Sequence, residues 1–148
     1  MRRKIRLLLL LVGAASGAAH ASDDAVAAAE VLLRHDAATD HTYLHDNGAR
    51  FRYFITSGGA DLPAASLARL RDTGLIFLPG SLWTAEKGKH VGHDMHVSIG
   101  EPEPLPDGSF RITYGFYCGT LCHSGNTAIL RHDTSGWRVV SSRLNSIS

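Results

Sequence analysis

Two cysteines and a histidine with the potential for chemistry stand close together near the C-terminal end of the chain: Cys118, Cys122 and His123. Three kinds of chemistry suit this group. The thiols can form a structural disulfide, act as a redox pair, or hold copper or zinc together with the imidazole of His123. The spacing differs from the two-residue gap of thioredoxin-type motifs. We therefore favour a structural disulfide, with the redox and metal sites as alternatives.

A disulfide between Cys118 and Cys122 sets a condition on the backbone. Bridged cysteines have Cα atoms roughly 4.4 to 6.8 Å apart, whereas four residues of extended strand span about 13 Å. The chain must therefore fold back between them, and Gly119 suits such a turn because glycine accepts positive φ angles. Because the ring is small, we expect it to fix a tight hairpin or bulge and to add at most roughly 3 kcal/mol.

A second group with metal-binding chemistry is a segment that contains His90, His93 and His96. Imidazole is a common ligand for zinc and copper. In a strand, however, His93 points to one face and the other two to the opposite face, where they stand about 20 Å apart. A shared site needs a bend at Gly92 or a ligand from another strand, such as His123. We treat these four histidines as metal candidates and predict no cofactor, with copper or zinc as the alternative.

The sequence around the cysteines follows a recognisable pattern, which runs Tyr117-Cys118-Gly119-Thr120-Leu121-Cys122, then Ser124-Gly125, then Gly136-Trp137-Arg138-Val139-Val140. It resembles small exported bacterial proteins that share a Tyr-Cys-Gly-x-Leu-Cys motif and have no established activity. The resemblance reaches back through Arg52-Tyr53-Phe54 and residues 67–74. Those proteins usually have glycine after the second cysteine, where this chain has His123.

The first 21 residues have the features of a signal peptide. A basic start (Arg2, Arg3, Lys4 and Arg6) precedes an apolar run, and Ala19-His20-Ala21 supplies a small-x-small cleavage site. The apolar run is shorter than the roughly 20 residues needed to span a bilayer. We therefore expect cleavage after Ala21, release into the periplasm or the medium, and no stable membrane anchor afterwards.

Removing residues 1–21 makes the chain mildly acidic. Four of the 15 Lys and Arg residues lie there and none of the 14 Asp and Glu, so 11 basic residues remain and the formal net charge is −3. Nucleic-acid binding needs clustered Lys and Arg. We therefore exclude DNA and RNA as principal partners, and we expect residues 22–148 to form one domain.

Helical patterns occur in the first half of this domain. Ser22 can cap a helix that starts at Asp23, since acids follow in its first turn and apolar residues recur at helical spacing. We expect the helix to extend beyond His35, with a continuation through Leu44 as the longer alternative. A shorter helix follows at about 62–73, with Asp61 as its expected cap and Gly74 as its stop.

Strand patterns occupy the rest. Residues 50–56 suit one strand and 91–99 another, and 110–118 alternate with period 2, which puts Phe110, Ile112, Tyr114 and Phe116 on one face. Two more strands are expected at 127–132 and 137–144, giving a C-terminal antiparallel meander. These elements predict an α+β fold, with both helices packed on a curved antiparallel sheet in a nuclear-transport-factor-like or cystatin-like arrangement.

Fold alone assigns no function. The sequence has no nucleophile elbow, phosphate loop, dinucleotide fingerprint or paired-histidine zinc motif. We expect a non-enzymatic binding or accessory protein that takes a small ligand or an envelope protein through the open end of the helix-covered sheet. The alternative is a copper- or zinc-binding or thiol-redox protein that uses Cys118, Cys122 and the histidines.

Overall fold

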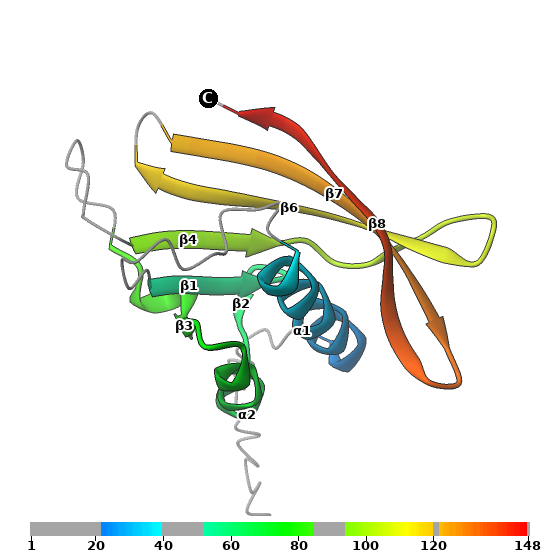
Figure 1. Cartoon of the computed structure of the whole chain (residues 1–148), viewed down its shortest axis with the longest axis horizontal. Helices are drawn as coiled ribbons and strands as arrows, with labels where there is room; N and C mark the ends of the chain where they lie inside the picture. Colours follow the sequence, from blue (N-terminus) through cyan, green and yellow to red (C-terminus); the bar gives the residue numbers. More distant parts are fainter. Residues whose placement is uncertain (1–21, 40–51, 85–93, 120–121, 148) are drawn as a thin grey trace, which may run out of the picture.

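The computed structural model describes residues 22–39, 52–84, 94–119 and 122–147. The elements, with 3-10 turns marked η, are α1 (Asp23–Ala38), β1 (Arg52–Ser57), β2 (Ala60–Asp61), α2 (Ala64–Arg69), η1 (Leu70–Thr73), β3 (Ile76–Pro79), η2 (Gly80–Leu82), β4 (Asp94–Ile99), β5 (Glu103–Pro104), β6 (Ser109–Gly119), β7 (Cys122–Asp133) and β8 (Gly136–Ile147). This order confirms the predicted α+β class (Figure 1).

Helix α1 begins where the sequence predicts. The Ser22 side chain accepts a hydrogen bond from the Ala25 N–H at 3.2 Å, which satisfies one of the free donors of the first turn. Its buried stripe contains Ala25, Ala28, Ala29, Leu32, Leu33 and Asp36. The possible extension of the helix to Leu44 lies outside the described residues.

The second helix differs from the prediction at its start. Pro63 occupies the cap position of α2, and no side chain caps the helix. The Asp61 carboxylate instead accepts hydrogen bonds from the backbone N–H and the hydroxyl of Ser81, at 2.7 and 2.6 Å. The predicted Asp61 cap is therefore wrong, because a distant residue competes for the carboxylate. Gly74 ends η1 with φ at 79°, which confirms the predicted stop.

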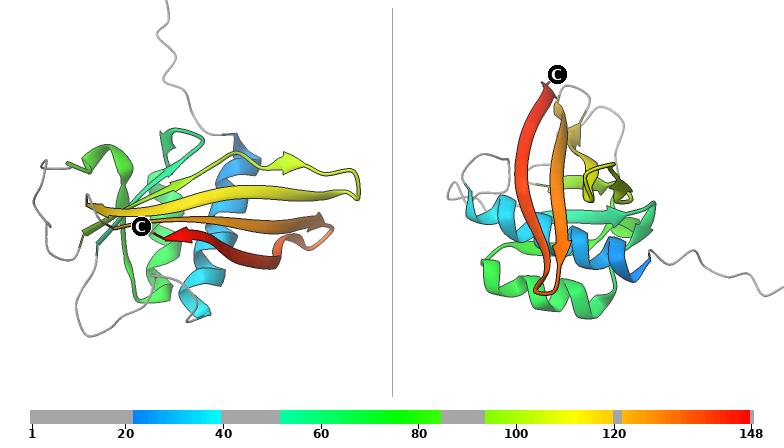
Figure 2. Two further views of the ribbon diagram at one scale, coloured as in Figure 1. Left: turned by 90° about the horizontal axis from the view of Figure 1, so that it is seen from above. Right: turned by 90° about the vertical axis from the view of Figure 1, so that its right-hand side faces the viewer.

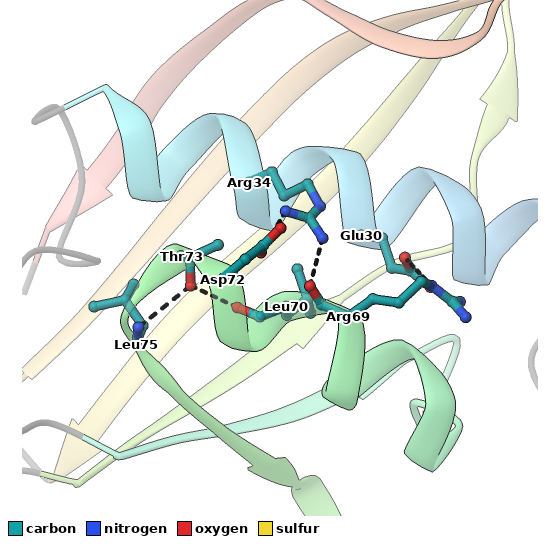
Figure 3. Close-up of polar contacts among 7 residues, drawn as sticks. All are labelled: Glu30, Arg34, Arg69, Leu70, Asp72, Thr73 and Leu75. Atoms are coloured by element: carbon teal, nitrogen blue, oxygen red, sulfur yellow. Dashed lines mark hydrogen bonds and ion pairs between the residues drawn. The ribbon is translucent and has the colours of Figure 1, made fainter.

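Two arginines join α2 and η1 to α1 (Figure 3). Arg34 donates to the Asp72 carboxylate and to the Arg69 carbonyl, both at 2.6 Å. Arg69 in turn makes a bidentate ion pair with Glu30 of α1. The two helical segments are therefore fixed to each other by side chains from both.

The sheet has the order β2-β1-β4-β6-β7-β8. From β4 onward the neighbouring strands on this path are antiparallel, which confirms the predicted meander. β1, however, pairs in parallel with both β3 and β4, and these parallel pairings were not predicted.

The alternation of apolar residues along β6, the strongest pattern in the sequence, places one face of this strand in the core. Ile112, Tyr114 and Phe116 of β6 are at most 5% exposed, as the alternation predicts, whereas Thr113 between them is exposed. Phe110 is only half-buried and packs edge-on against Trp137 with ring centroids 4.8 Å apart. Trp137 is itself partly buried and packs against the core.

The helices and the long strands form two layers (Figure 2). Seen from above, β6, β7 and β8 lie in front of α1, and α1 passes behind the β7–β8 hairpin in the right-hand view. Buried side chains of α1 pack with inward-facing residues of β1, β4, β6 and β7. Among the described elements, no helix lies over the other face of β6, β7 and β8, and this uncovered face is where the candidate site lies.

Candidate functional site

Strand register brings four aromatic or imidazole side chains into one row on the uncovered face. Phe54 of β1 pairs with His96 of β4, His96 with Tyr117 of β6, and Tyr117 with His123 of β7. Side chains directly opposite each other on neighbouring strands lie on the same face and interact. The chain therefore assembles this row from four separate strands.

Trp83, just after η2, covers part of the row. Its ring centroid lies 5.4 Å from that of Phe54, 6.0 Å from that of His96 and 6.4 Å from that of Tyr117. Its plane is nearly parallel to the His96 ring and almost perpendicular to the Tyr117 ring. Phe54 is buried as a result, with 6% of its surface exposed. We refer to Phe54, Trp83, His96 and Tyr117 as the aromatic cluster.

His96 is partly buried within this cluster, and this burial disfavours the charged form of its imidazole. Burial lowers the pKa of its imidazole below the ordinary value. Its Nε2 lies 3.4 Å from the Thr56 hydroxyl on β1. Because β4 stands between β1 and β6, a side chain that reaches Thr56 leans away from His123 on β7.

Next to the row, two glycines leave the face without side chains. Gly115 of β6 pairs with Gly125 of β7, between Ser98 of β4 and Ser146 of β8. A Cβ on Gly115 would stand 2.8 Å from the Ser124 carbonyl oxygen, so the close approach of the strands requires glycine there. The gap is a shallow hollow of about 420 Å³.

The hollow is lined by groups that hydrogen-bond without carrying a fixed charge. The lining residues are Ser98, Thr113, Tyr114, Gly115, His123, Gly125, Asn126, Asn145 and Ser146. None of them is Asp, Glu, Lys or Arg. The Asn145 side chain donates to the Thr127 hydroxyl at 2.7 Å, which orients its amide at the rim. The hollow thus offers hydroxyl, amide and imidazole groups over a floor of backbone.

The cysteines lie at the end of the same strand pair. Cys118 and Cys122 are joined by a disulfide with Cα atoms 5.2 Å apart, as predicted. Gly119 has a φ of 138°, which confirms the expected fold-back, and the strand register shifts between Tyr117 and Gly119. The disulfide therefore closes the β6–β7 hairpin directly beside the Tyr117–His123 pair.

The predicted metal candidates are only partly described. His90 and His93 lie outside the described residues. His96 and His123 share the uncovered face, but Tyr117 lies between them. The His96 Nε2 lies near the Thr56 hydroxyl, on the side away from His123. Within the described ranges, no group of three or more His, Cys, Asp or Glu side chains could hold a metal ion.

Sequence reasoning missed a buried carboxylate on the helix-covered face. Asp36 of α1 is 1% exposed, and burial raises its pKa from 3.8 to about 6, although the hydrogen bond that it accepts from Tyr114 acts in the opposite direction. Burial and the nearby Asp36 also raise the pKa of Tyr114. The signal that could have found this pair is spacing, because Asp36 continues the stripe of Ala29 and Leu33.

A second hollow, of about 590 Å³, lies between α1 and the turn of the β7–β8 hairpin. Its two arginines are already engaged, since Arg34 bonds to Asp72 and Arg69 pairs with Glu30. Glu30, Arg34 and Arg69 therefore join the helical segments and are not free to bind a ligand there.

Comparison with known proteins adds no relative. No family model, curated protein or solved structure matches the chain. The resemblance to small exported proteins with the Tyr-Cys-Gly-x-Leu-Cys motif therefore stays a prediction. None of the helices in the described part of the chain is long and apolar enough to cross a membrane.

Proposed function

We propose that this protein is a small exported, non-enzymatic binding protein whose ligand occupies the hollow on the uncovered face of the sheet. The observation that supports this most is the lining of the hollow, where hydroxyl, amide and imidazole groups surround two adjacent glycines. Ligand sites combine a concave surface with a few fixed polar groups and neighbouring aromatic side chains. The hollow and the aromatic cluster provide this combination.

The chemistry of the lining favours binding over catalysis. General acid–base reactions usually need two positioned groups that exchange protons near neutral pH. Among the nine lining residues, His123 and Tyr114 have side chains that serve as general acids or bases in enzymes, but His123 is exposed and Tyr114 faces the core on the other side of the sheet. Hydroxyl and amide groups instead recognise a ligand through hydrogen bonds without transferring a proton.

Export is part of the proposal. The disulfide between Cys118 and Cys122 suits an oxidising compartment such as the periplasm or the medium. Helix α1 begins at Asp23, so cleavage after Ala21 leaves each described element in place. The net charge of −3 after cleavage does not suit a nucleic acid as the partner, because nucleic-acid binding needs clustered Lys and Arg. The proposed partner is therefore a small ligand or an envelope protein.

We extend the proposal to the fold. A long N-terminal helix, a short second helix and a C-terminal meander support a nuclear-transport-factor-like or cystatin-like arrangement of residues 22–148.

The second candidate function is copper binding, zinc binding or thiol-redox chemistry. It has less support, because the thiolate is the form of cysteine that attacks or binds metal and both sulfurs are in the disulfide.

Native mass spectrometry of the mature protein mixed with the small-molecule fraction of an envelope extract tests the proposal. We expect adducts on the unmodified protein and their loss in Gly125→Val, which fills the hollow. A Cβ on Gly125 meets only the Ser146 hydroxyl, at 2.9 Å, and this side chain can turn away. The matched control is Ser141→Val on the same face of β8, outside the lining.

Two results would contradict the proposal. One is the absence of adducts on the unmodified protein. The other is adducts that persist equally in Gly125→Val and in Ser141→Val, since the ligand would then bind elsewhere. A stoichiometric mass increase from copper or zinc, lost when His96 or His123 is changed to alanine, would promote the second candidate.

A further inference from the structure

We propose that the ligand of this hollow is a neutral oligosaccharide, an inference that rests on the proposed function and names its ligand class. Four properties of the uncovered face point to this ligand class: the charge of the lining, the type of hydrogen-bonding group, the position of the aromatic cluster, and the size of the hollow.

The absence of fixed charge in the lining selects against ionic ligands. Phosphate and carboxylate ligands are held by Arg or Lys, which supply charge-assisted hydrogen bonds. The nine lining residues include neither. On the same face, Arg52 is paired with the Asp94 carboxylate, with its Nε 2.7 Å from Oδ1. Arg111 is paired with Glu103, and Arg143 lies outside the lining. Ligand charge is therefore not compensated in the hollow, and a neutral molecule fits best.

The remaining groups match a ligand with many hydroxyls. Serine and threonine hydroxyls both donate and accept, and the Asn145 amide does both through separate atoms. A sugar hydroxyl also donates and accepts, so each group in the lining can pair with one. Gly115 and Gly125 have no side chains, so a sugar ring can approach their backbone closely.

The aromatic cluster supplies the apolar contact that a sugar needs. A pyranose ring has C–H groups on its faces as well as hydroxyls at its edge, and aromatic rings pack against such apolar surfaces. Tyr117 is half-buried and lies two residues after Gly115 on the same face of β6, with Trp83 against its ring. Aromatic surface and hydrogen-bonding groups are therefore adjacent, as an amphipathic ring requires.

The size of the hollow agrees with this ligand class. Its volume of about 420 Å³ lies within the range of roughly 300 to 1,000 Å³ that small-molecule sites occupy. Its shallow form leaves it open to solvent, so the ends of a longer sugar chain can extend past the rim. We therefore expect binding to a few consecutive sugar units rather than enclosure of a single one.

Titration calorimetry and amide shift mapping with N,N′,N″-triacetylchitotriose, maltotriose and cellotriose test the inference. We expect at least one trisaccharide to bind saturably, with shifts at Ser98, Gly115 and Gly125. Asn145→Ala should weaken this binding about tenfold, the loss of one good hydrogen bond. Val140→Ala, an exposed change on β8 outside the lining, should leave the affinity within about twofold.

The outcomes separate this inference from the proposed function. If no trisaccharide binds at millimolar concentration while extract adducts still disappear in Gly125→Val, the hollow binds another class of molecule and only the sugar assignment fails. Displacement of a bound trisaccharide by equimolar inorganic phosphate would overturn the neutral-ligand argument. Trisaccharide binding that is unchanged in both Asn145→Ala and Gly125→Val would place the sugar elsewhere and overturn the inference.

Discussion

At the scale of single residues, Asp36 makes the clearest pH-dependent contribution. Its carboxylate is buried on the helix-covered face, where burial raises its pKa to about 6 from 3.8. Between these values Asp36 binds more protons in the folded protein than in the unfolded chain, so its own contribution to stability is greatest below about pH 4 and is lost as the pH rises through 6. The full loss is roughly 3 kcal/mol for a shift of about two units.

Replacing Asp36 with asparagine should remove this loss, because the amide has no charge to bury yet keeps an oxygen for the Tyr114 hydroxyl. We expect Asp36→Asn to be more stable than the unmodified protein at pH 8 and similar to it at pH 4. Urea unfolding at the two pH values measures this difference. The same difference between variant and unmodified protein at both pH values would show that Asp36 is not buried in its charged form.

The sequence predicted those interactions that join residues close together in the chain. The Cys118–Cys122 disulfide and the fold-back at Gly119 both follow from spacing and the properties of glycine, and the structure has them. The Asp61 cap failed because its carboxylate is used by Ser81, twenty residues later. Local sequence describes what a side chain can do, whereas tertiary contacts decide which partner it has.

At the scale of elements, the alternation along β6 determines which substitutions matter. Ile112 is completely buried, while Thr113 points to the uncovered face and is exposed. We expect Ile112→Ala to lower the free energy of unfolding by roughly 2 to 5 kcal/mol. Thr113→Ala should change it by less than about 1 kcal/mol. Equal, small effects in denaturant unfolding of the two variants would contradict the strand assignment.

The disulfide belongs to the same scale, because it fixes the end of the β6–β7 hairpin. The double variant Cys118→Ser with Cys122→Ser should remain folded and melt at a lower temperature, with a loss at or below roughly 3 kcal/mol. Circular dichroism melting measures this, and the unmodified protein with its disulfide reduced is the control. Complete loss of the fold, or an unchanged melting temperature, would show that the small ring has a different role.

Strand pairing was harder to predict than strand position. The antiparallel meander follows from short connections between successive strands. The parallel pairing of β1 with β4 joins Arg52 to Asp94, and hydrophobic alternation contains no information about a partner that far along the chain. The hollow depends on the register of the antiparallel strands, since Ser98 reaches it because β4 lies beside β6, and Ser146 reaches it because β8 lies beside β7. Alternation does not give the register between strands, so the sequence did not reveal that Gly115 and Gly125 pair with each other.

At the scale of the whole molecule, the proposed export makes a prediction about the N-terminus of the mature protein. If residues 1–21 are removed, the mature chain begins at Ser22, the residue that caps α1. We expect N-terminal sequencing of protein from the envelope or the medium to start at Ser22-Asp23-Asp24. Mature protein that retains Met1 would contradict export by this route and would remove the oxidising compartment from the argument.

The central claim is that the uncovered face, and not the helix-covered one, meets the ligand. Amide spectra of the mature ¹⁵N-labelled protein, recorded while the small-molecule fraction of an envelope extract is added, test it most directly. We predict saturable shifts confined to the hollow and its rim, at Ser98, Thr113, Gly115, Gly125 and Ser146. Shifts concentrated on α1, α2 or the β7–β8 turn, with these five signals unmoved, would contradict the account.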